Sequence, residues 1–230
     1  SQRRAVISLY RGGEKLVLED IDVVLAKANQ ALQTLQRYRT TLGDSSLRLT
    51  ALEFQGTVTL DDVVAVIQRS ESMDRVAREV ARYVSELGSE GRLVRMQSEE
   101  LMGAVEDDYV MLLRDYSADP RPRKVMAVKN QIAKLKTDQL LDGVTVAQLL
   151  GHGGSADLLE HTVSPRGYRL LHKIPLLPGP VVHRIVDHFE DLPSLLAASK
   201  EELVDVDGVA ERRAEAIYDG LERMRQYGTL

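Results

Sequence analysis

The residues best suited to bind a ligand lie near the C-terminus, in a helix–turn–helix pattern. Residues 199–217 read SKEELVDVDGVAERRAEAI, in which Ser199 is suited to cap a short helix and Gly208 to turn the chain. A second helix follows the turn. The apolar positions that frame the turn at regular spacing are Leu203, Val206, Ala214, Ile217 and Leu221. This spacing is typical of a helix–hairpin–helix, here named the second hairpin (residues 199–221), although Ala210 stands where a second turn glycine is usual.

The chemistry open to this pattern is the binding of a phosphate by the protein backbone. Amides in the turn and at the start of the next helix have no partner within the helix, so they point outward together. Gly208 has no side chain to keep a phosphate away, and Arg212 and Arg213 can add charge-assisted hydrogen bonds. Such a site holds nucleic acid without reading its bases. The predicted DNA-binding residues are Gly208, Val209, Ala210, Glu211, Arg212 and Arg213.

A weaker copy of the pattern, named the first hairpin, precedes it. Residues 168–189 read YRLLHKIPLLPGPVVHRIVDHF, with a turn around Pro178-Gly179. Pro180 suits the first turn of the second helix, but it removes one amide from the anion site. The apolar residues expected before the turn are Ile174 and Leu176, and those expected to face the core after it are Val182, Ile185 and Phe189. The predicted DNA contacts are Lys173, Pro178, Gly179 and Arg184.

Two other interpretations of these hairpins stay open. Helix–turn–helix units that contain a glycine also serve as packing or protein-contact modules, so a scaffold that binds no DNA is an alternative function. Arg212 and Arg213, taken singly, are also typical of solvated charges on a helix.

The overall composition limits other functions. The 230 residues carry a net charge of −5 and include 5 His and no Cys. The lack of Cys excludes disulfides, thiolate metal sites and a cysteine nucleophile, and it fits the cytosol; we expect no metal site. No apolar run approaches about 18 residues, so no membrane span is expected. Because the chain is not a general polycation, any DNA binding must be local.

Charge is distributed unevenly along the chain. Residues 20–120 carry 11 basic and 18 acidic side chains, and residues 164–230 carry 9 and 11. Between them, residues 121–136 carry 6 basic side chains and no acidic one. This basic stripe supplies the possible additional DNA contacts Arg121, Arg123, Lys124 and Lys129.

The first 19 residues predict a β-hairpin. Residues 5–10 and 15–18 are β-branched and apolar, and Gly12-Gly13 is a strong signal for a two-residue turn. No further strand pattern follows, so we expect this hairpin to be the last piece of a truncated β-containing domain. A lone hairpin cannot bury both faces. We therefore expect fast hydrogen exchange at Val6, Ile7 and Val17.

Residues 20–120 have helical periodicity and predict a helical bundle or spine. Three long helices are expected at residues 22–42, 59–88 and 92–116. Gly43 is expected to end the first helix, and Thr59 to cap the start of the second. A purely structural spacer is the simplest interpretation of this region.

Residues 121–163 predict a connector with short helices at 125–135 and 144–149. The glycine cluster at 151–155 predicts a flexible turn, and no Gly-Lys-Ser/Thr follows it, which excludes a nucleotide-binding loop. His152 and His161 are expected to be solvated. The two hairpins then form a domain at residues 164–230.

Four segments, in the same order along the chain, are similar to one bacterial family. They are ANQALQTLQRYR at 28–39, ELGSEGRL at 86–93, VSPRGYRLL at 163–171 and DVDGVAERRA at 205–214. They resemble the DNA integrity scanning proteins, which are diadenylate cyclases, and in particular the actinobacterial forms. The resemblance covers nearly the whole chain and is weakest at residues 120–160. It implies a mainly α fold, with a helical spine followed by a tandem helix–hairpin–helix domain of the RuvA type.

The resemblance also implies what a full-length member does. Such proteins form octamers, contain an N-terminal cyclase domain and make cyclic di-AMP from two ATP with Mg²⁺ or Mn²⁺. They act in DNA damage and repair in the cytoplasm, in association with the nucleoid. The family's cyclase signatures, an Asp-Gly-Ala triplet and a Gly-x-Arg-His-Arg stretch, are missing from this sequence, in which no His precedes His152. We therefore assign no catalytic residue and no cofactor to this chain and expect no cyclic di-AMP from it alone.

The predicted function is the sequence-independent, structure-selective binding of branched DNA by residues 164–230. The alternatives are a protein-interaction or oligomerisation scaffold, or a cyclase subunit that is active only with a missing N-terminal domain.

Overall fold

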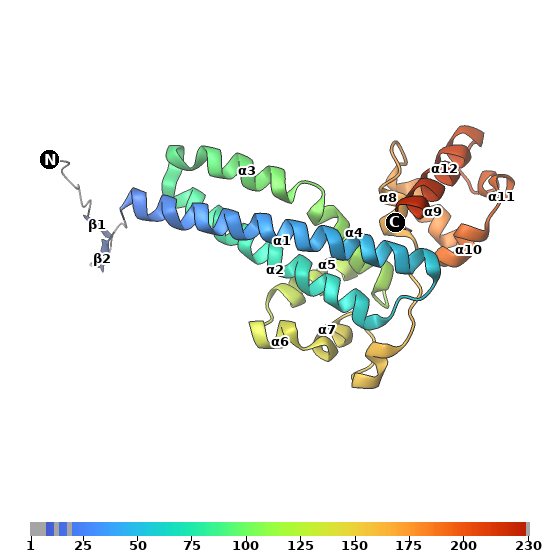
Figure 1. The fold of residues 1–230 in the computed structure, drawn as a ribbon, viewed down its shortest axis with the longest axis horizontal. Coiled ribbons are helices and arrows are strands. Elements are labelled where there is room, and N and C mark those ends of the chain that lie inside the picture. The colour runs from blue at the N-terminus through green and yellow to red at the C-terminus, as the bar shows by residue number, and fades with distance from the viewer. Residues whose placement is uncertain (1–7, 12–13, 18–19, 229–230) are drawn as a thin grey trace. The chain divides into compact units, whose positions relative to one another are not determined.

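The structure of the chain is a computed structural model, which describes residues 8–11, 14–17 and 20–228 and the side-chain surroundings of residues 20–226. This part of the chain is mainly α-helical, as predicted (Figure 1). Contacts divide the chain into two compact units, residues 1–39 with 72–103 and residues 40–71 with 104–230. None of the helices formed by the described residues has the length and hydropathy of a membrane span.

Two short strands form the predicted hairpin near the N-terminus. Strand β1 (Ser8–Arg11) pairs antiparallel with β2 (Glu14–Val17), so that Ser8 lies opposite Val17 and Arg11 opposite Glu14. The other residues of this prediction, Ala5, Val6, Ile7, Gly12, Gly13 and Leu18, lie outside the described residues.

The prediction that Gly43 ends the first helix is wrong, because α1 (Ile21–Gln55) continues through it. A glycine inside a helix costs only about 1 kcal/mol relative to alanine. Leu42 and Leu49, on either side of Gly43, are buried, and the burial of each leucine contributes roughly 1.5–3 kcal/mol. Packing therefore outweighs the local preference of the glycine.

Helix α2 (Leu60–Leu87) begins where the sequence predicts. The Asp62 amide donates to the Thr59 hydroxyl over 3.3 Å, and the Thr59 amide donates to the Asp62 carboxylate over 3.1 Å. Thr59 thus caps the helix, and Gly88, at a φ of +58°, follows its end. A short 3-10 turn, η1 (Gly88–Gly91), comes next.

The third predicted helix is two helices, α3 (Arg92–Met102) and α4 (Val105–Tyr116). Gly103 separates them at a φ of +22°, which a right-handed helix does not accommodate. In the first unit, α3 packs on the first half of α1 and the second half of α2. The buried side chains of this core are Val24, Ala28, Ala31, Val80, Tyr83, Val84, Leu87 and Val94.

The connector is more ordered than the sequence predicts. It contains α5 (Pro122–Ala133), α6 (Thr137–Leu141), α7 (Gly143–Leu149) and the 3-10 helix η2 (Ala156–Glu160), of which α6 and η2 were not predicted. The expectation that His152 is solvated is wrong, since it is half-buried and its Nε2 lies 2.8 Å from the Tyr116 carbonyl oxygen. His161 is exposed, and its carbonyl accepts a hydrogen bond from the Leu60 amide.

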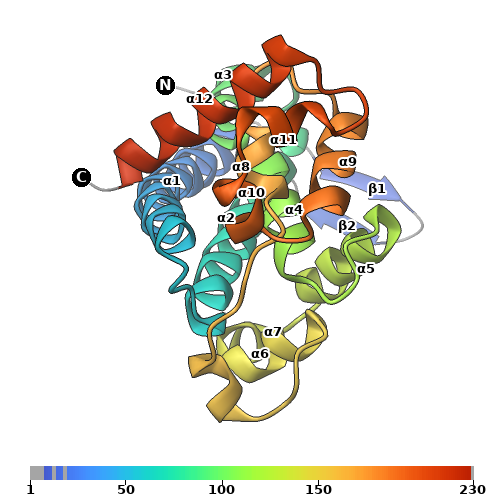
Figure 2. The same cartoon turned by 90° about the vertical axis from the view of Figure 1, so that its right-hand side faces the viewer.

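Five helices form the C-terminal part of the second unit and gather into one group (Figure 2). They are α8 (Tyr168–His172), α9 (Gly179–Phe189), α10 (Leu192–Ala197), α11 (Lys200–Val204) and α12 (Glu211–Gly228). Helices α8 and α9 belong to the first hairpin, α11 and α12 to the second, and α10 joins them. The two hairpins share one core, in which Leu171, Ile185 and Ile217 are fully buried.

Candidate nucleic-acid interface

The second hairpin begins with a capped helix, as its sequence predicts. The Glu202 amide donates to the Ser199 hydroxyl over 3.2 Å, and the Ser199 amide donates to the Glu202 carboxylate over 2.7 Å. These two bonds satisfy amides at the start of α11. Leu203 and Val206 then enter the core and fix the direction in which the chain reaches the turn.

The turn itself is centred on Gly208, which has a φ of +84°. This conformation favours glycine, because any Cβ would be strained there. Val209 is buried and its amide donates to the Val206 carbonyl over 2.9 Å, so the predicted contact Val209 is a structural residue. Ala210, Glu211 and Arg212 are exposed at the start of α12, where the first amides have no partner within the helix.

The two arginines after the turn differ in their surroundings. Arg213 folds back on the turn, and its guanidinium donates to the Gly208 carbonyl over 2.6 Å. Arg212 is exposed one residue earlier. The Arg213 guanidinium therefore lies at the turn, and Arg212 is exposed in the first turn of α12.

Arg184 joins the two hairpins. It comes from α9 in the first hairpin, and its Nε donates to the Asp207 carbonyl in the second over 2.7 Å. A Cβ on Gly208 would lie 2.5 Å from an Arg184 nitrogen and 3.5 Å from the Val181 side chain. The start of α9 thus lies against the Gly208 turn, an arrangement that the sequence did not predict.

The first hairpin leads into α9 at Gly179. Pro178 precedes the helix with extended backbone, and its carbonyl accepts from the amides of Val181 and Val182. A Cβ on Gly179 would meet no atom within 4 Å, and its φ is not positive. Nothing inside the described chain therefore requires glycine at this position.

Leu176 was expected to be one of the apolar residues before the turn, and the structure does not bury it. Ile174, Val182 and Ile185 are buried and Phe189 is half-buried, as predicted. Leu176 is 96% exposed and has a φ of +62°. It belongs to the turn rather than to the apolar segment before it.

Lys173 is less available than predicted, because it faces a carboxylate. Its Nζ lies 3.3 Å from the Asp108 carboxylate on α4. Burial, together with the nearby charge of Arg169, lowers the pKa of Lys173, while Asp108 opposes that shift. A phosphate would have to compete with Asp108 for this ammonium group.

A buried polar network supports the first hairpin, and the sequence did not reveal it. The Asp115 carboxylate accepts hydrogen bonds from the amides of Gly167, Tyr168 and Arg169 over 2.7–2.9 Å, at the start of α8. Burial and the charge of Glu53 raise the pKa of Asp115 to about 7, against the effect of the Arg169 and Tyr168 amides. The network fixes where α8 sits on α4.

Arg169 completes this network on the side of α1. Its side chain is 1% exposed; it pairs with Glu53 and donates to the Thr50 hydroxyl over 2.9 Å. Burial opposes its charge, but the carboxylates of Glu53 and Asp108 outweigh that effect and raise the pKa of Arg169. Arg169 is therefore an anchor of the fold and is closed to a ligand.

Only some cations of the basic stripe (residues 121–136) are available to bind DNA. Lys129 is buried and its Nζ lies 2.7 Å from the Glu106 carboxylate, while the Arg121 Nε donates to Asp119 over 2.9 Å. Arg123 and Lys124 are exposed near the start of α5. Two of the four possible contacts in the stripe are thus engaged with carboxylates of the chain.

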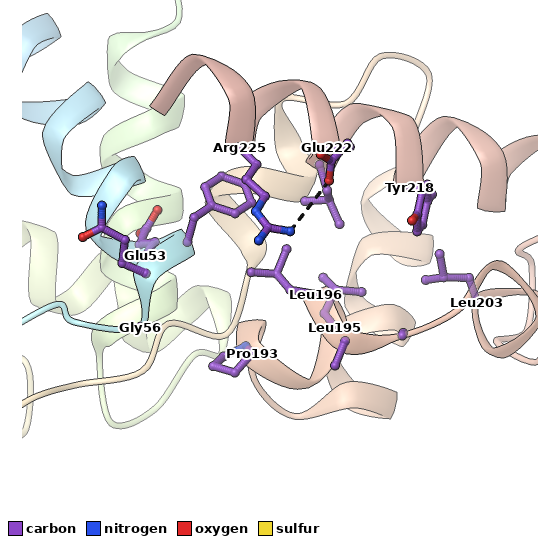
Figure 3. Close-up of a pocket in the computed structure, with 14 residues that line it drawn as sticks. Glu53, Gly56, Pro193, Leu195, Leu196, Leu203, Tyr218, Glu222 and Arg225 are labelled. Carbon is purple, nitrogen blue, oxygen red and sulfur yellow. Dashed lines mark ion pairs between the residues drawn. The ribbon is translucent and has the colours of Figure 1, made fainter. Parts of the chain in front are cut away.

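A cavity of about 400 Å³ lies on another side of the same group of helices. Figure 3 shows its lining by Glu53 and Gly56 at the end of α1, Leu195 and Leu196 of α10, and Arg225 of α12. Its described lining residues include none of the predicted DNA contacts. The cavity is therefore separate from the hairpin turns.

Comparison with known proteins shows which family model and which curated proteins the chain is similar to. The family model described as the DisA bacterial checkpoint controller linker region matches residues 18–159. A curated relative from Carboxydothermus hydrogenoformans, named DNA integrity scanning protein DisA, is 46% identical over 98% of this chain and 64% of its own length. The protein of the same name from Streptomyces coelicolor is 45% identical over the whole chain and 62% of its own length. The chain thus spans a little under two thirds of the curated relatives it matches.

Proposed function

The chain belongs to the DNA integrity scanning protein DisA family, and from that premise we propose that its two C-terminal hairpins bind DNA through the phosphate backbone. Binding is independent of base sequence and favours branched DNA. The residues proposed to carry it are Gly208, Ala210, Glu211, Arg212 and Arg213 in the second hairpin and Pro178, Gly179 and Arg184 in the first.

The observation that carries the proposal is the juxtaposition of two helix starts. Val181 of α9 and the Gly208 turn before α12 lie against each other, and Arg184 bonds across them. The start of α12 offers amides without partners in the helix, and the start of α9 offers the Gly179 amide, because Pro180 has no N–H and the Val181 amide donates to Pro178. Both starts offer the positive end of the helix dipole. Neighbouring phosphates along one DNA strand would meet two such ends at once.

The absence of a side chain at Gly179 supports the same proposal. Glycine destabilises a helix relative to alanine, and the space beside Gly179 is open within the described chain. Close approach of a ligand to the backbone is a physical reason for glycine at such a place.

The net charge of residues 164–230 favours DNA binding through backbone amides over DNA binding by a basic surface. Residues 164–230 carry 9 basic and 11 acidic side chains, so long-range attraction for DNA is weak. Affinity would depend on amides and a few local cations, which predicts a shallow dependence on salt.

The activity of the whole protein is a separate proposal that rests on the family alone. We propose that a full-length protein forms an octamer in the cytoplasm and makes cyclic di-AMP from two ATP with Mg²⁺ or Mn²⁺. DNA held by the hairpins would regulate that reaction. The chain described here carries neither cyclase signature, so its own part would be to bind DNA.

The experiment that tests DNA binding uses Gly179→Ala. This change meets no atom of the described chain, so the melting temperature should stay at or above that of wild type. Fluorescence anisotropy with a four-way junction and a duplex of equal length would measure affinity. We expect Gly179→Ala to weaken binding to both DNAs at least about fivefold, or about 1 kcal/mol.

The control is Gly88→Ala, at a glycine that also has open space but lies in the first unit. At a φ of +58°, alanine strains the backbone at position 88 but leaves both hairpin turns unchanged. The Gly88→Ala variant should therefore bind DNA with the affinity of wild type. A folded wild-type chain that binds neither DNA would reject the proposal and favour the scaffold alternative.

A further inference from the structure

The tip of the first hairpin presents a leucine in a conformation that leucine disfavours. Leu176 has a φ of +62°, in the left-handed region that favours glycine. Its side chain is 96% exposed, the highest value among the large hydrophobic residues in the described part of the chain. Neither backbone preference nor burial in the core explains a leucine at this position.

The second hairpin shows which residue type suits the backbone conformation of the turn. Leu171 and Ile174 are buried before Leu176 with the same spacing that Leu203 and Val206 have before Gly208. Gly208 has a φ of +84°, so the two turns share a left-handed residue at the corresponding position. The second hairpin has glycine there, whereas the first hairpin has an exposed apolar side chain.

The residues around Leu176 make its position rigid. Pro175 directly precedes it, Pro178 and Pro180 follow two and four residues later, and all three are exposed. The proline ring fixes φ, so these residues limit the conformations of the turn. The apolar tip therefore loses little conformational entropy when it contacts a partner.

Leu176 lies close in sequence to the proposed phosphate contacts, which makes DNA the partner expected at the tip of the first hairpin. Gly179 follows Leu176 by three residues, and the start of α9 contacts the Gly208 turn. DNA held at these two turns would bring its sugars and bases to the tip. Apolar side chains that contact DNA insert where base steps are unstacked or easily unstacked.

We propose that Leu176 packs against unstacked bases and is the residue that makes binding selective for branched DNA. This inference rests on the proposed function, because the phosphate contacts bring the DNA to the tip. Continuous duplex keeps its bases stacked and gains little from the leucine. A junction or a break already exposes base faces, so the same contact strengthens binding there.

The test compares the full chain with Leu176→Asn and Leu176→Gly. Both replacements tolerate a positive φ, so each variant should melt at or above the wild-type temperature. We expect affinity for a four-way junction to fall about tenfold, while affinity for a duplex of equal length changes less than twofold. The matched control is Leu141→Asn, at an exposed leucine on α6, and it should leave both affinities unchanged.

A second measurement uses 2-aminopurine at the branch point of the junction. Wild-type protein should change its fluorescence on binding, and Leu176→Asn should lose most of that change even at saturating protein. A junction preference that survives in both Leu176 variants would overturn the inference, while loss of duplex binding in Gly179→Ala would still uphold the proposed function. A wild-type chain that binds neither DNA would overturn both.

Discussion

Two arginines in the C-terminal hairpins show how differently charge is used in two regions of this molecule. Arg169 is buried, pairs with Glu53 and belongs to the network that holds α8. Arg213 is exposed and rests on the carbonyl of Gly208 at a hairpin turn. A buried charge without its partner is costly, whereas an exposed one contributes little to folding. The comparison predicts that changes in the buried network alter stability and that changes at the turns alter binding.

The largest effect is expected from Arg169→Met. This change leaves Glu53 buried without its cation, so the free energy of unfolding should fall by about 3–5 kcal/mol. Urea denaturation followed by circular dichroism would measure the loss.

The double variant Arg169→Met/Glu53→Met sharpens this prediction. It removes both charges, so it should be clearly more stable than Arg169→Met alone. A single variant as stable as wild type would mean that the network is not an anchor.

The second prediction concerns pH and Asp115. Its folded pKa, raised by burial and Glu53 to about 7, lies above the ordinary value of 3.8. Between these values the folded chain binds the proton more tightly than the unfolded chain, so stability should fall as pH rises from about 4 to 7. The slope from this group reaches about 1.4 kcal/mol per pH unit.

Asp115→Asn is the matched variant for this measurement. It cannot ionise, so its unfolding free energy between pH 4 and 7 should vary less with pH than that of wild type. Equal slopes in urea titrations at pH 5, 6 and 7 would show that Asp115 is ionised throughout this range in the folded state.

The third prediction concerns Gly208→Val in the exposed region. Valine at a φ of +84° is strained and would displace the Arg184 guanidinium, so stability should fall by roughly 1–3 kcal/mol. Binding to the four-way junction should fall more than tenfold. Gly88→Val is the control, because it imposes a similar backbone strain in the first unit. Its folded form should bind the junction with wild-type affinity. Equal junction affinities of the two valine variants would exclude the Gly208 turn as a DNA contact.

The smallest effect is expected from Arg212→Ala. It removes one exposed cation, so stability should change by less than about 0.5 kcal/mol. The slope of log affinity against log salt should flatten by about 0.9, equally for junction and duplex. Arg223→Ala, on the same helix, is the control and should keep the wild-type slope.

The sequence was sufficient where neighbouring residues determine the structure. Thr59 and Ser199 cap α2 and α11 with hydroxyl and carboxylate contacts made within three residues. Gly208 turns the chain between two apolar segments, and the positive φ follows from that spacing. The mainly α fold and both helical pairs could be predicted on this basis.

The sequence was insufficient where distant contacts decide the outcome. Gly43 lies inside α1, between buried leucines, while Gly103 breaks a helix at a φ of +22°. Arg169 and Lys173 are both near apolar residues in the sequence, yet their partners Glu53 and Asp108 lie far along the chain. No local signal indicates that these two cations are engaged.

Binding of DNA by the two hairpin turns can be measured at the turn amides themselves. A chain labelled with ¹⁵N only at its 16 glycines would be titrated with a four-way junction and followed by two-dimensional NMR. Gly179→Ala and Gly208→Ala each remove one signal and so assign these two glycines. We expect the amide signals of Gly179 and Gly208 to move most and to saturate together, while that of Gly88 stays in place. Saturable binding that leaves the Gly179 and Gly208 signals unmoved would contradict this expectation.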